Sequence, residues 1–80
     1  MQEVSILHLF KDDRLVGVMT PDIMGMDHIV YPEGASQETQ KEVMRILATV
    51  PVCRDIIERE RLVKEAYERE GFVVNKILEK

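Results

Sequence analysis

The stretch MGMDH, residues 24–28, comes closer to a metal site than any other segment of this sequence. Met24, Met26 and His28 alternate along it, and alternate residues of a strand share one face. Two thioethers and an imidazole are donors that a soft ion such as Cu(I) accepts. Methionine also fills irregular gaps in apolar cores, and Val30 continues the same face without being a ligand. We therefore favour packing or a contact surface, keep a soft metal site as an alternative, and expect no cofactor.

Methionines have a second use, because their flexible side chains adapt to partner surfaces. Three of them fall within eight residues around Pro21, and the first 35 residues carry six acidic and two basic side chains. Acidic turns keep a small protein in solution, and they also suit a basic partner surface. The residues expected to face a protein partner are Met19, Met24, Met26, Asp12, Asp13 and Asp22.

Residues 39–64 have the outline of a helix-turn-helix, with a turn near Ala48 to Pro51. Arg54, Arg59 and Arg61 are the side chains that would face DNA. Residues 51–70, however, hold six acids against five bases, whereas phosphate binding requires clustered Lys and Arg. Nucleic acid is therefore an unfavoured partner, and a DNA-binding regulator is kept only as an alternative function.

Cys53 is the single cysteine and has two opposed interpretations. Beside Arg54, in the first turn of a helix expected to begin near Pro51, its thiol would be more reactive. It also falls on an apolar stripe with Val52, Ile56 and Ile57, where a buried, inert thiol is expected. One cysteine cannot form an internal disulfide, which suits a reducing compartment. We expect a cytoplasmic protein.

Enzyme motifs are missing from the sequence. There is no glycine-rich phosphate loop, no GxSxG, no HExxH and no Cys and His cluster at zinc spacing. No apolar run approaches the roughly 20 residues that span a bilayer, and the N-terminus lacks the basic segment of a signal peptide. The prediction is a protein that is neither an enzyme nor a membrane protein.

The elements that must position these residues begin with a hairpin. EVSILHLF is apolar at both sets of alternate positions, as in a strand covered on both faces or buried at a subunit contact. KDDR predicts a tight turn, because Asp tolerates left-handed backbone. RLVGVMT is the return strand, and Gly17 within it indicates a bulge or a close backbone approach.

The rest of the chain predicts one short strand, two helices and a final strand. MDHIVY follows a loop or single helical turn at Thr20 to Asp22, and Ser36 is a helix N-cap. The first helix stops near Pro51, where the second begins, and Gly71 ends that one before the strand FVVNKIL. The order is β-β-β-α-α-β. It predicts a single α+β domain of residues 1–80, in which a mostly antiparallel sheet of three to four strands carries both helices on one face.

Size and composition complete the prediction. With 45% apolar and 32% charged residues the chain is globular, but a domain of this length buries only about 60% of its unfolded surface. Association would add to that small core. We expect a small interaction or regulatory module that forms a homodimer, through sheet edges or the second helix, and that binds a protein partner.

Overall fold

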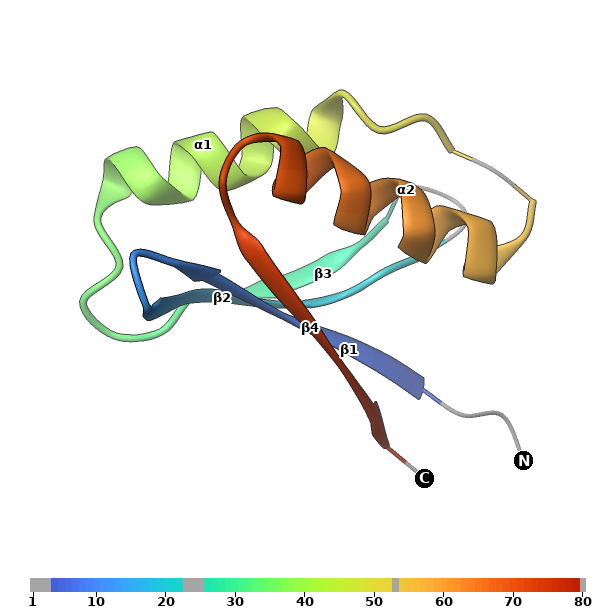
Figure 1. Cartoon of the computed structure of the whole chain (residues 1–80), viewed down its shortest axis with the longest axis horizontal. Coiled ribbons are helices and arrows are strands. Elements are labelled where there is room, and N and C mark those ends of the chain that lie inside the picture. The colour runs from blue at the N-terminus through green and yellow to red at the C-terminus, as the bar shows by residue number, and fades with distance from the viewer. Residues whose placement is uncertain (1–3, 23–25, 53, 80) are drawn as a thin grey trace.

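The computed structural model describes residues 4–22, 26–52 and 54–79 of the chain. Its elements, in chain order, are β1 (Val4–Lys11), β2 (Arg14–Thr20), β3 (His28–Val30), α1 (Gln37–Ala48), α2 (Ile56–Arg69) and β4 (Val73–Glu79). The strands form one antiparallel sheet in the order β3-β2-β1-β4, and both helices lie on one side of it (Figure 1). The α+β class and the order of elements predicted from the sequence are confirmed.

The β1–β2 hairpin forms as its residue types predict. Asp12 and Asp13 make the turn at φ 52° and 62°, a left-handed conformation that Asp tolerates better than most residues. The pairing register shifts between Leu9 and Phe10, and Leu9 lies opposite Gly17. A Cβ on Gly17 would stand 3.5 Å from Leu9 Cδ1. That distance is an ordinary van der Waals contact with a side chain, so of the two features considered for Gly17 the structure shows the bulge beside it and no close backbone approach.

Helix α1 begins where Ser36 caps it, since the Ser36 hydroxyl accepts a hydrogen bond from Thr39 N at 3.1 Å. Helix α2 begins five residues later than the sequence analysis expected. Its N-cap is Asp55, whose carboxylate accepts from Ile57 N at 3.0 Å, and Val52 and Arg54 belong to a linker between the helices. The predicted start was wrong because proline permits a helix start, whereas a side-chain acceptor satisfies the free amides there. Neither helix has the length and apolarity needed to cross a membrane, in the part of the chain described.

The core fills the space between the helices and the inner face of the sheet. Its fully buried members include Leu7 and Leu9 from β1 and Val63 and Tyr67 from α2. The Tyr67 hydroxyl donates to the carbonyl of Val43 at 2.8 Å and thereby joins α2 to α1. Burial raises the pKa of Tyr67 above its ordinary value, so the phenol remains a donor at neutral pH.

Candidate functional site

The face of the sheet turned away from the helices, called the outer face below, is the candidate site. Its members follow from strand alternation: Leu7 and Leu9 are buried against the helices, so Ile6, His8 and Phe10 point the other way. The pairing register extends this assignment to the other strands. The outer face carries Ile6, His8, Phe10, Leu15, Val18, Thr20, His28, Val30, Val73, Asn75 and Ile77.

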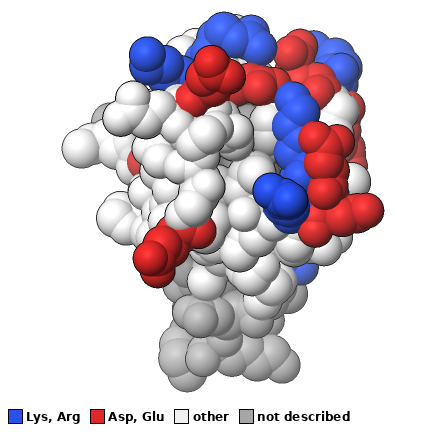
Figure 2. Space-filling model, turned by 90° about the vertical axis from the view of Figure 1, so that its left-hand side faces the viewer, with Lys and Arg blue, Asp and Glu red and all other residues white. Residues whose placement is uncertain are grey.

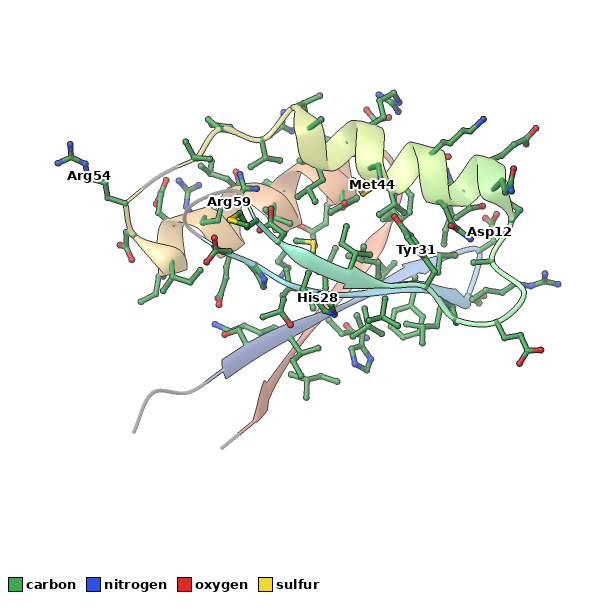
Figure 3. The ribbon with its side chains drawn as sticks, turned by 180° about the vertical axis from the view of Figure 1, so that it is seen from behind. Asp12, His28, Tyr31, Met44, Arg54 and Arg59 are labelled. Atoms are coloured by element: carbon green, nitrogen blue, oxygen red, sulfur yellow. The ribbon has the colours of Figure 1, made fainter. Side chains whose placement is uncertain are left out.

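This face is apolar although nothing packs on it. Val30 at one edge is 53% exposed, and Val73 at the opposite edge is 58% exposed. Figure 3 shows side chains projecting from the side of the sheet opposite the helices, with no element of the fold beyond them. An antiparallel sheet with a solvated face usually alternates apolar and polar residues. That alternation is missing here, and because monomeric proteins seldom leave a continuous apolar patch in water, this face is the candidate site.

Charge is segregated to the other side of the molecule. Among the side chains that the structure describes, the outer face has no Asp, Glu, Lys or Arg. On the helix side, Lys11 pairs with Glu42 at 2.7 Å and Lys76 pairs with Glu60 at 2.8 Å. Figure 2 shows acidic and basic side chains gathered over the top, where the helices lie, and fewer below.

His8 occupies the middle of the outer face. One row of paired residues crosses all four strands, from Val30 through Val18 and His8 to Asn75. Along β1 the imidazole has Phe10 as a neighbour, with ring centroids 6.4 Å apart. His28 lies on the edge strand β3, paired with Thr20. The sequence has two histidines, and the fold brings both to this face.

The residues of the proposed soft metal site do not share one strand in the described structure. Strand β3 comprises only residues 28–30, so Met26 precedes it and is 81% exposed, while Met24 lies outside the described residues. Asp27, which precedes the strand, directs its carboxylate inward to an arginine. Within the described ranges, no group of three or more His, Cys, Asp or Glu residues is placed to hold a metal ion.

The expected partner-binding residues are distributed over separate parts of the fold. Met19 is a fully buried member of the core, contrary to the expectation that it faces a partner. Asp12 and Asp13 are exposed at the β1–β2 turn. Asp22 is half-buried in the β2–β3 loop, where its carboxylate accepts from Met26 N at 3.3 Å. Figure 3 labels Asp12 at one end of the molecule and Arg59, beside that loop, at the other. These residues therefore do not form one surface.

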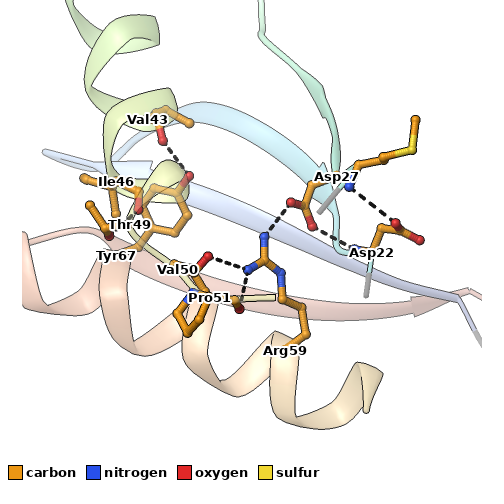
Figure 4. A network of polar contacts seen from close by, with 10 residues as sticks. Asp22, Asp27, Val43, Ile46, Thr49, Val50, Pro51, Arg59 and Tyr67 are labelled. Atoms are coloured by element: carbon orange, nitrogen blue, oxygen red, sulfur yellow. Dashed lines mark hydrogen bonds and ion pairs between the residues drawn. The ribbon is translucent and has the colours of Figure 1, made fainter. Parts of the chain in front are cut away.

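The three arginines of the DNA-binding alternative also separate. Arg59 is 2% exposed and its Nη2 donates to Oδ2 of Asp27, itself 1% exposed, at 2.7 Å. Its Nη1 donates to the carbonyls of Val50 at 2.9 Å and Pro51 at 2.8 Å (Figure 4). Arg59 thus ties the linker and the β2–β3 loop to α2, and it cannot reach a phosphate.

The two remaining arginines are exposed, but they lie in different surroundings. Arg61 pairs with Glu58 and, at 2.9 Å, with Glu65 on its own helix, while Arg54 lies in the linker. The carboxylates of Glu58 and Glu65 lie where a phosphate would have to bind Arg61, and they would repel that phosphate. Cys53, whose exposure the sequence left open, lies outside the described residues.

A hollow of about 300 Å³ lies beside the buried ion pair. It is lined by Asp27, Met44, Leu47, Ala48, Val50, Val52 and Arg59. Asp27 and Arg59 are its charged groups, and they neutralise each other. The walls are otherwise apolar, so this hollow offers a ligand little that would fix its orientation.

Comparison of this chain with known protein families, with curated proteins and with solved structures found no match. The candidate site is therefore defined by its own geometry, as a largely apolar face whose described side chains include no Asp, Glu, Lys or Arg.

Proposed function

We propose that this protein is a non-catalytic protein-interaction module that associates with itself by stacking the outer faces of two copies. One observation carries the proposal: among the side chains that the structure describes, the outer face is largely apolar and has no Asp, Glu, Lys or Arg, although no described element of the fold covers it. Each Å² of apolar surface removed from water stabilises the assembly by roughly 25 cal/mol. A monomer would lack that stabilisation.

A second copy is the occupant that best matches the charges. The protein has a net charge of −4, and two like-charged copies repel each other unless their charged surfaces stay apart. Stacking through the outer face leaves the ion pairs of the helix side facing outward in both copies. A two-fold contact also requires a self-complementary surface, and an uncharged face satisfies that condition without matching opposite charges.

The size of the outer face is adequate for a dimer. With about 4.8 Å between strands and about 3.3 Å per residue, the three strands of seven or eight residues and the three-residue β3 cover roughly 400 Å² in projection. The relief of the side chains enlarges the accessible area beyond that projection. Specific interfaces bury at least about 1,000 Å² in total, or about 500 Å² on each partner. The face is therefore close to the necessary area before its relief is counted.

The alternatives of an edge or an α2 contact explain less of the structure. The outward side of α2 is occupied by Arg61 and its two glutamate partners, and such exposed pairs contribute little to binding. Pairing through the free edge of β4 would lengthen the sheet and still leave the outer face in water. The single cysteine suits a reducing compartment, so we place the module in the cytoplasm.

The proposal is tested by three valine-to-lysine variants in sedimentation equilibrium. Val30→Lys and Val73→Lys introduce a charge at opposite edges of the outer face. Val52→Lys is the matched control, since Val52 is 63% exposed in the linker on the helix side. We expect the wild type to have twice the 9.3 kDa of one chain. Burying an unpaired ammonium in each copy should raise the dissociation constant at least about tenfold for both face variants, with no change for Val52→Lys.

Three results would contradict this expectation. A wild type that stays at 9.3 kDa at high micromolar concentration would rule out self-association. A response to Val73→Lys without one to Val30→Lys would indicate pairing through the β4 edge. An equal response to Val52→Lys would show that added charge, and not its position, controls assembly.

A further inference from the structure

We propose that His8 makes this self-association depend on pH, so that the dimer forms at neutral pH and dissociates as the imidazole is protonated. The inference rests on the proposed function and adds a regulator to the same surface. It starts from the placement of His8 in the middle of the outer face, on one of the two inner strands of the sheet.

Among the described side chains of the outer face, none is a counter-ion for an imidazolium at His8. Val18 lies beside it on β2 and Asn75 on β4. Along β1, Ile6 and Phe10 are its neighbours on the same face. From β3 the face receives Val30 and His28, and His28 is the only other titratable group among the described side chains there. The ion pairs involving α1 and α2 lie on the opposite side of the sheet.

Stacking would add a like charge opposite His8. When two copies stack face to face, the two-fold axis lies in the plane of contact and passes through its middle. A residue in the middle of the face therefore meets its own equivalent. Two neutral imidazoles are compatible with an apolar contact, whereas two imidazolium groups would be desolvated and would repel each other.

The direction of the pH effect follows from linkage. The dimer favours neutral His8, because stacking would desolvate the charged form, whereas in the separated chains the half-exposed imidazole can hold a proton in contact with water. Dissociation therefore binds protons, and acid favours it. With one excluded proton per chain, lowering the pH from 7.5 to 5.5 should raise the dissociation constant about a hundredfold.

The test measures the dissociation constant at pH 7.5 and 5.5, at equal ionic strength, for the wild type and three histidine variants. His8→Gln and His8→Phe remain uncharged at both pH values, and we expect each to lose the pH response. His28→Gln is the matched control, because His28 lies on the exposed edge strand, where water can still hydrate its charge. It should keep most of the hundredfold change. Far-UV circular dichroism at both pH values checks that the chains stay folded.

The outcomes separate this inference from the proposed function. A wild type that is monomeric at pH 7.5 overturns both. A wild type that dimerises equally well at both pH values overturns the pH switch alone. So does a full pH response in both His8 variants, or a loss of helix and sheet signal in the wild type at pH 5.5.

Discussion

At the scale of single residues, Arg59 shows how residue type can mask periodicity. The buried positions of α2 are Arg59, Glu60, Val63 and Tyr67, which repeat at helical spacing. Arg59 therefore falls on the inward face, four residues before Val63. Because arginine is charged, its residue type nevertheless predicted an exposed position. Its partner Asp27 is 32 residues away in the sequence. Periodicity was the available signal, but no local pattern in the sequence identifies such a partner.

Replacing Arg59 with methionine should be strongly destabilising. Met fills a similar volume, but it leaves the buried carboxylate of Asp27 without its cation and the carbonyls of Val50 and Pro51 without their donor. Loss of one partner of a buried ion pair costs about 3–5 kcal/mol. Urea unfolding followed by circular dichroism measures the change in the free energy of unfolding.

The matched control is Arg61→Met, on the same helix. Arg61 is exposed and its ion pairs are on the surface, so the unfolding midpoint should hardly move. Equal effects of the two substitutions would show that the buried pair contributes nothing specific to stability.

At the scale of elements, the features that depend on local chemistry were predictable. The turn at Asp12 and Asp13, the irregularity at Gly17 and the Ser36 cap all follow from what neighbouring residues can do with the backbone. The start of α2 was predicted wrongly because Pro51 and Asp55 both resemble start signals. The third strand is shorter than MDHIVY suggested, and the tertiary contact of Asp27 with Arg59 just before it has no local signal in the sequence.

The β1–β2 turn can be improved by one substitution. Asp13 has a φ of 62°, and glycine takes up that conformation without steric cost. Asp followed by Gly is also a preferred pair for two-residue hairpin turns. Relief of the left-handed strain outweighs the extra entropy that glycine gives the unfolded chain, so Asp13→Gly should raise the free energy of unfolding by about 0.5 kcal/mol, measured by urea denaturation. Asp13→Asn removes the same charge but keeps a residue suited to the turn. Its effect therefore measures how much of the change in the free energy of unfolding comes from the lost charge.

A β-branched residue at the same position gives the opposite test. Asp13→Val should lower stability by about 1 kcal/mol or more, because its side chain clashes with the backbone at positive φ. A stabilising valine would mean that the turn changes conformation at little cost.

At the scale of the whole molecule, one sequence pattern already carried information about assembly. EVSILHLF is apolar at both sets of alternate positions, which indicated a strand covered on both faces or buried at a subunit contact. The fold covers one face with helices, and Ile6, His8 and Phe10 remain on the other. The sequence could not reveal that β2 and β4 extend this face. Their contribution depends on the register of pairings between distant segments.

The last prediction concerns the stability of the assembly. If folding and stacking are coupled, unfolding of the dimer yields two chains, and the midpoint of thermal unfolding rises with protein concentration. For a chain of this length, a tenfold higher concentration should raise the midpoint by about 4 °C. Calorimetry over a hundredfold range of concentration measures the slope. Val30→Lys should unfold at a lower temperature and with a smaller dependence on concentration, whereas Val52→Lys should keep the wild-type slope. A wild type without any slope would mean that the outer face contributes no stability through association, because mass action allows no other result for a dimer that unfolds into monomers.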